Sequence, residues 1–152
     1  MLTGSDLLNK VKELGDVSKS DLVRACGYVS NKKDGGDRLN FTAFYEALLE
    51  AKGVQVTLTR TAEVDVDLPP RVSLANRIGA TAFVSIHANA ISMSRPDVNG
   101  IETFYFSDPR SARLAAHIQQ QVLNVSPGSP NRGVRRGRFF VIRRTTMPAT
   151  LV

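Results

Sequence analysis

The sequence of 152 residues has the length of one ordinary domain. Hydrophobic residues make up 42% of it and charged residues 22%, a composition that argues against wholesale disorder. Its single cysteine, Cys26, excludes an internal disulfide and a thiolate zinc site. The first 20 residues lack the apolar core of a signal peptide, and no apolar run reaches about 18 residues. We therefore expect a cytoplasmic protein without a membrane span.

The net charge of +6 is unevenly distributed along the chain. Residues 1–53 carry eight basic and eight acidic side chains, whereas residues 54–152 carry twelve basic and six acidic ones. Every basic residue of the second part is an arginine, all six lysines lie in the first part, and all seven prolines follow residue 68. This abrupt change predicts two modules of different origin, residues 1–53 and residues 54–152.

Helical periodicity dominates the first module. Apolar residues recur at helical spacing after Ser5, again around Leu22, and from Phe41 to Leu49, where Gly53 is a natural residue to end the helix. The polar stretch 31–37 predicts a turn or a hairpin tip. We therefore expect a small helical module.

The second module begins with a change of period from 3.6 to 2 over residues 54–60, which predicts a half-buried strand. Two prolines open a predicted helix over residues 71–78, which Gly79 ends. The apolar run 82–86 is typical of a strand buried on both faces of a parallel sheet.

Further elements follow in the same alternation. Residues 101–106 read as a strand, and Ser111 is the expected cap of a helix that reaches Leu123. Residues 132–138 read as a basic loop, and two more strands are expected at 139–143 and from 150. The alternation predicts an α/β fold with flanking helices around a sheet.

His87 is the strongest single candidate for chemistry because it follows the apolar strand, where open α/β sheets place catalytic groups. An imidazole there could bind zinc or move protons, and the alternative is a hydrogen-bonded residue at a strand end. Asn89 and Glu102 could orient the ring. His117 is expected on a helix surface, so a complete zinc site would need carboxylates.

Several motifs place His87 in a wider pattern. They are Gly53 to Arg60, Leu68-x-x-Arg71 with Ala75-Asn76, Phe83-Val-Ser-Ile-His-Ala-Asn-Ala90, Asn99-Gly-Ile-Glu-Thr-Phe-Tyr-Phe106, Arg132-Gly-Val and Met147-Pro-Ala149. Together, residues 53–152 resemble the zinc-dependent N-acetylmuramoyl-L-alanine amidases of bacterial cell-wall turnover.

The resemblance implies an α/β domain acting on peptidoglycan in the periplasm or cell wall. Its zinc would polarise the amide between muramic acid and L-alanine and activate a water. His87 matches a family zinc ligand, and Asn89, Glu102 and Arg132 fall near the implied site as supporting or substrate-binding residues.

The sequence also departs from this family. The initial strand with its zinc-binding histidine loop and the ligand glutamate of the first helix have no counterpart, and the general-base glutamate would directly follow Val152. One ligand of three implies weak or absent zinc. We therefore expect no turnover from this chain alone, and we expect self-association through sheet edges left unpaired.

Residues 1–53 resemble the N-terminal region of AbrB-like transcriptional regulators of cyanobacteria, through Leu2 to Leu14, Ser20 to Tyr28 and Arg38 to Gly53. The resemblance implies DNA binding, in which Lys32, Lys33 and Arg38 could contact phosphates. The alternative is a solvated turn, which the zero net charge of this module favours. A DNA-associated regulator without catalysis is therefore the alternative function.

The arginines of residues 132–144 leave three interpretations open. They could bind nucleic acid, contact the carboxylates of peptidoglycan peptides or the acidic polymers of the wall, or form a solvated basic rim. Because all of them lie in the amidase-like part, the overall basicity is no argument for DNA.

Overall fold

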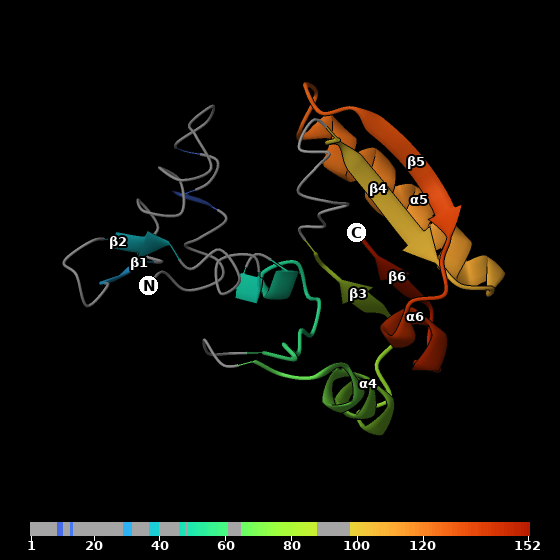
Figure 1. Cartoon of the computed structure of the whole chain (residues 1–152). Helices are drawn as coiled ribbons and strands as arrows, with labels where there is room; N and C mark the ends of the chain where they lie inside the picture. The colour runs from blue at the N-terminus through green and yellow to red at the C-terminus, as the bar shows by residue number, and fades with distance from the viewer. Residues whose placement is uncertain are drawn as a thin grey trace. The chain divides into compact units, whose positions relative to one another are not determined.

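The computed structural model describes residues 51–60, 65–87 and 98–152, together with residues 9, 10, 13, 29–31, 37–39, 46, 47, 49 and 50. The chain divides into two compact units, Met1–Leu58 and Thr59–Val152 (Figure 1). Among the described residues, no helix has both the length and the apolar character that a membrane crossing requires.

The first unit contains a hairpin and helical turns. Strands β1 (Val29–Asn31) and β2 (Asp37–Leu39) pair antiparallel, which confirms the predicted hairpin. The described residues 46, 47, 49 and 50 are helical, and Gly53 follows them with a φ of 78°. The Gly53 amide donates to the Glu50 carbonyl at 2.9 Å, as expected of a glycine that ends a helix.

The second unit is built on a four-stranded sheet in the order β3-β6-β4-β5 (Figure 1). The strands are β3 (Phe83–Ser85), β4 (Ile101–Tyr105), β5 (Asn131–Arg136) and β6 (Ala149–Leu151). Strand β6 pairs parallel to β3 and antiparallel to β4, while β4 and β5 are parallel. β3 and β6 therefore end at the same end of the sheet at which β4 and β5 begin.

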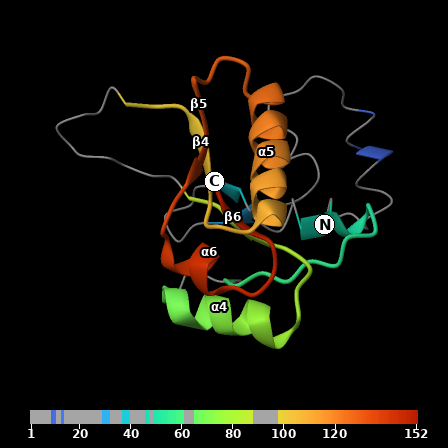
Figure 2. The same ribbon diagram turned by 90° about the vertical axis from the view of Figure 1, so that its right-hand side faces the viewer.

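Three helices flank this sheet: α4 (Leu68–Arg77), α5 (Pro109–Asn124) and α6 (Phe140–Arg144). Helix α5 lies along β4, β5 and β6, and the two other helices contact each other (Figure 2). Helix α4 begins at the predicted prolines and is followed by Gly79, whose φ is 61°. The predicted α/β fold with a central sheet and flanking helices is thereby confirmed.

The apolar core lies between α4, α6 and strands β3 and β6. Its buried members are Val72, Ala75, Phe83, Val141, Ile142, Met147, Ala149 and Leu151. Phe104 of β4 packs against this cluster and meets Phe139 edge to face, with ring centroids 4.9 Å apart. Because side chains alternate along a strand, the neighbouring Thr103 points to the opposite face of the sheet, where α5 lies.

Two predictions for the end of the chain are wrong. The expected basic loop 132–138 contains the edge strand β5, since an edge strand tolerates arginines whose heads reach water. The expected strand 139–143 is helix α6. Its adjacent residues Val141 and Ile142 are both buried, which one turn of helix allows and a strand with one covered face does not.

Two other strand predictions also need correction. No described strand pairs with residues 54–60, whose alternation produces only an extended segment. In the run 82–86, Phe83 and Ser85 are buried, but Val84 is 44% exposed and Ile86 is 82% exposed. The described residues therefore cover only one face of β3.

The start of α5 differs from prediction as well. Asp108 caps this helix by accepting a hydrogen bond from the Arg110 amide at 2.8 Å, and Pro109 occupies the first turn. Ser111 is instead buried, and its hydroxyl accepts a bond from the Ala149 amide at 3.0 Å. The predicted cap therefore joins α5 to β6.

The capping carboxylate of Asp108 predicts a pH-dependent loss of stability. Hydrogen bonds from the Arg110 side chain and backbone hold the pKa of Asp108 below its ordinary value. The stabilisation by the ionised form is present above about pH 4 and is lost as the pH falls through the lowered pKa. We expect Asp108→Ala to lower the midpoint of thermal unfolding at pH 7 and to differ less from wild type at pH 3. Asp108→Asn, which keeps an acceptor oxygen, is the control, and equal losses in both variants would contradict the capping role.

Candidate functional site

A pocket of about 270 Å³ opens at the end of the sheet where β3 and β6 finish and β4 and β5 begin. His87, Glu102, Arg132 and Val152 line it, with the segment Val98–Ile101, Ile86 and Val122 of α5. Because β6 and β4 are antiparallel, the residues that follow β3 and β6 lie beside the residues that begin β4 and β5. This arrangement creates the site.

His87 lies directly beyond β3, as predicted. Its amide donates to the Val152 carbonyl at 2.8 Å, and the Val152 amide donates to the Ser85 carbonyl at 2.8 Å, so the backbone on both sides of the ring is held. The ring Nε2 lies 2.9 Å from the hydroxyl of the buried Ser85. The direction of this hydrogen bond depends on which ring nitrogen carries the proton. The side chain of His87 is exposed and therefore accessible to a ligand.

Glu102 and Arg132 form an ion pair beside the histidine in the lining of the pocket. The Arg132 Nε lies 3.1 Å from the Glu102 Oε2, and the two side chains are 23% and 16% exposed. Glu102 opens β4 and Arg132 lies near the start of β5, so the parallel pairing of these strands sets their approach. The bond uses one guanidinium nitrogen, and the remaining donors of the arginine are suited to a carboxylate.

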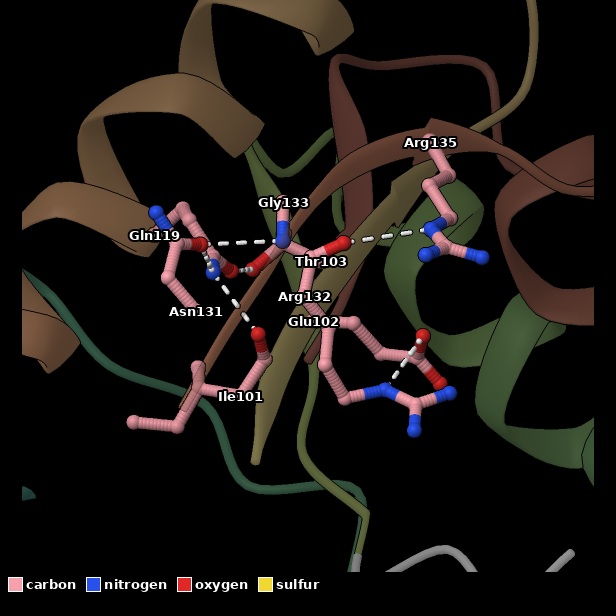
Figure 3. Close-up of polar contacts among 8 residues, drawn as sticks. All are labelled: Ile101, Glu102, Thr103, Gln119, Asn131, Arg132, Gly133 and Arg135. Atoms are coloured by element: carbon pink, nitrogen blue, oxygen red, sulfur yellow. Dashed lines mark hydrogen bonds and ion pairs between the residues drawn. The ribbon is translucent and has the colours of Figure 1, made fainter. Parts of the chain in front are cut away.

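A buried glutamine of α5 braces the strands behind this ion pair (Figure 3). Gln119, 4% exposed, accepts from the Thr103 hydroxyl at 2.6 Å. Its amide donates to the Ile101 carbonyl and to the Asn131 side chain, both at 2.8 Å. Asn131 also accepts from the Gly133 amide at 2.9 Å. These bonds fix the first residues of β4 and β5, which carry Glu102 and Arg132.

Gly100 sets how closely the two strand beginnings approach each other. Its φ is 118°, and a Cβ atom there would lie 2.5 Å from the Pro130 carbonyl oxygen. The same oxygen accepts a hydrogen bond from the Ile101 amide at 2.9 Å. A side chain at position 100 would therefore separate the segments before β4 and β5, so the rim of the pocket depends on glycine.

The described residues do not fit a complete zinc site. No group of three His, Cys, Asp or Glu side chains within 51–60, 65–87, 98–152 or the described residues before them could hold a metal ion. In the pocket, His87 contributes one imidazole, and the carboxylate of Glu102 is already paired with Arg132. Structural zinc sites take four protein ligands and catalytic ones three.

The structure brings three of the predicted site residues together, namely His87, Glu102 and Arg132. Asn89, Lys32 and Lys33 lie outside the described residues, and Arg38 is described only as part of the backbone of β2. His117 is exposed on α5, as expected. Sequence analysis missed Gln119 and Ser85. For Gln119 a signal existed, because it continues the four-residue spacing of Ser111 and Ala115 along the covered side of α5.

Replacing Gln119 tests the brace behind the pocket. We expect Gln119→Leu to lower the free energy of unfolding by about 2 kcal/mol, since the Ile101 carbonyl and the Thr103 hydroxyl would be buried without partners. The neighbouring Gln120 is exposed, so Gln120→Leu is a control of the same chemistry on the same helix. Chemical denaturation measures both variants, and equal effects would show that the brace contributes nothing.

Comparison with known proteins identifies relatives of the chain. A family described as N-acetylmuramoyl-L-alanine amidase matches residues 38–152. The N-acetylmuramoyl-L-alanine amidase LytC of Bacillus subtilis is 39% identical over 107 residues, which are 68% of this chain and 21% of that protein. The probable cell wall amidase LytH of Staphylococcus saprophyticus is 33% identical over 110 residues, 70% of this chain and 34% of that protein. The chain thus spans between a fifth and about a third of the length of these two relatives.

Solved structures agree with these relatives. The N-acetylmuramoyl-L-alanine amidase AmiC2 of Nostoc punctiforme matches with a TM-score of 0.65 and 39% identity, over 80% of this chain and 68% of that one. The catalytic domain of CwlV, an N-acetylmuramoyl-L-alanine amidase from Bacillus (Paenibacillus) polymyxa var. colistinus, matches with a TM-score of 0.60 and 38% identity, over 70% of this chain and 57% of that one. Every residue of the pocket lies within the range that the family covers.

Proposed function

Since the chain belongs to the N-acetylmuramoyl-L-alanine amidase family, we propose that it serves as part of a cell-wall hydrolase that cleaves the amide between N-acetylmuramic acid and L-alanine in peptidoglycan. The observation that carries this proposal is the pocket at the end of the sheet, which joins His87 to the Glu102–Arg132 pair inside the matched range. The accessible imidazole of His87 and the guanidinium nitrogens of Arg132 that are not bonded to Glu102 suit an amide substrate that carries carboxylates.

Each pocket residue has a distinct proposed role. His87 is the metal ligand, held by the bonds of its amide and of its ring. Arg132 binds a carboxylate of the stem peptide with the donors that Glu102 leaves unused. Glu102 holds the guanidinium in place. Asn89 remains a predicted contributor outside the described residues.

Weak zinc binding by the chain alone is part of the same proposal. Affinity for zinc comes from several deprotonated ligands at fixed geometry, and the lining of the pocket offers only His87 and the Glu102 carboxylate, which is already paired with Arg132. The resemblance places the general-base glutamate directly after Val152. The backbone of Val152 pairs with both Ser85 and His87, so Val152 itself lies beside His87 at the pocket.

The beginning of the chain is a separate part of the proposal. We propose that residues 1–53 are an AbrB-like module, in line with the charge and composition change at this point. The family match begins at residue 38 and the compact units divide after Leu58, so the match to the amidase family extends into the third predicted helix. The comparisons offer no support for the DNA-binding alternative. Self-association and a cytoplasmic location stay predictions.

A fragment of the substrate tests the pocket without requiring turnover. We expect N-acetylmuramoyl-L-alanyl-D-isoglutamine to shift the amide NMR signals of residues that line the pocket. Arg132→Gln should weaken this binding about tenfold, because a charge-assisted bidentate contact is lost. Arg60→Gln removes an exposed charge outside the pocket and is the control. Shifts confined to other residues, or equal affinities for both variants, would contradict the proposed site.

Metal dependence is tested by the two histidines. In excess zinc, we expect no release of L-alanine-linked peptides from purified peptidoglycan, and His87→Ala should abolish the weak zinc binding. His117→Ala, on the exposed side of α5, should leave zinc binding unchanged. Mass spectrometry of any released peptides and zinc titration are the measurements. Zinc retained at one equivalent through purification would overturn the weak site, and equal behaviour of the two variants would overturn the role of His87.

A further inference from the structure

The last part of the chain carries basic side chains but no acidic ones. Residues 109–152 contain eight arginines and neither aspartate nor glutamate. Five of these arginines are exposed and lie within ten residues of sequence; this basic segment consists of Arg135, Arg136, Arg138, Arg143 and Arg144. It begins at the end of β5, on the outer edge of the sheet, and continues into α6 (Figure 1).

The basic segment is not neutralised within the described residues. The ion pairs between described residues are Lys10–Glu13, Arg110–Asp108 and Arg132–Glu102, and none of them includes a member of the segment. Arg132, at the other end of β5, is therefore committed to the pocket, while the five that follow form no ion pair with another described residue. Like charges concentrated in so short a stretch of a folded chain raise the local potential and attract polyanions.

Two of these side chains are already oriented. The Arg135 Nε donates to the Arg132 carbonyl at 3.2 Å (Figure 3). The Arg136 Nε donates to the Phe106 carbonyl at 3.1 Å. Each bond ties down the inner nitrogen and leaves the terminal nitrogens to an incoming anion. A guanidinium held in this way loses less conformational freedom when it binds a carboxylate.

The aromatic residues of the segment argue against nucleic acid. Single strands bind to aromatic faces, but Phe140 packs against the core, and Phe139, although 41% exposed, meets Phe104 edge to face. The single helix of the segment, α6, has five residues, which is short for a helix that reads a groove. The geometry thus fits a polyanion recognised by charge and hydrogen bonds alone.

We propose that the basic segment is a second peptidoglycan-binding surface, which holds the free carboxylates of the peptide stems while the pocket at the other end of β5 receives the amide. This inference rests on the proposed function for its choice of polymer. None of the five arginines lines the pocket, so the surface and the pocket can be tested independently.

The test is co-sedimentation of the full chain with purified insoluble peptidoglycan at increasing sodium chloride. We expect Arg138→Gln/Arg143→Gln/Arg144→Gln to bind about tenfold more weakly at physiological salt, since three screened charge contacts are lost. These side chains form no hydrogen bond or ion pair with the described residues, so the variant should fold. Lys52→Gln/Arg60→Gln/Arg113→Gln removes the same charge from other exposed positions and should bind within about twofold of wild type.

Two further binding measurements identify the chemical groups that bind each other. Peptidoglycan whose carboxylates have been converted to amides should no longer retain the wild-type chain, and Arg135→Gln/Arg136→Gln should weaken binding to untreated material. Equal losses in the segment and control variants, or full retention on amidated peptidoglycan, would overturn the proposal. So would tighter binding to duplex DNA than to peptidoglycan at physiological salt. Fragment binding at the pocket is a separate measurement, so failure of this surface leaves the proposed function standing, and the reverse also holds.

Discussion

The pairing of β6 with both of its neighbours is the constraint on which the second unit depends. This three-residue strand is almost completely buried, with Ala149, Thr150 and Leu151 each at most 4% exposed. It runs parallel to β3 and antiparallel to β4, and the Thr150 hydroxyl donates to the Phe104 carbonyl at 2.9 Å. Without it, β3 would have no partner and β4 and β5 would be an isolated two-stranded piece, too small to bury a core.

The direction of β6 also determines where chemistry can occur. In a fully parallel sheet, His87 and Glu102 would lie at opposite ends of the sheet, because one follows its strand and the other opens its strand. The antiparallel pairing of β6 and β4 brings them to the same end, and the bonds of Gln119 then hold β4 and β5 in register behind them. Packing of α5 is thus connected to the pocket through one buried polar side chain.

Long periodic elements were predictable from sequence, and short ones were not. Helix α5 and strand β4 have enough residues for their period to be recognised, and the hairpin of β1 and β2 follows from its polar turn. The run Phe139–Arg143 is too short for its period to separate strand from helix, and its conformation is decided by the core that Val141 and Ile142 enter. For the site, the position of His87 was predictable because a strand end is local. The partners of Gln119 were not, since they come from two strands that only the fold brings together.

The position of β6 in the chain has a kinetic consequence. The strand at the centre of the sheet comes after all the other described elements, and its partner β3 precedes it by more than sixty residues. During synthesis, β3, β4, β5 and the helices emerge with their apolar faces uncovered, and the sheet can close only when residues 149–151 have left the ribosome. Closing so long a loop makes folding slow and leaves an interval in which a chaperone could bind.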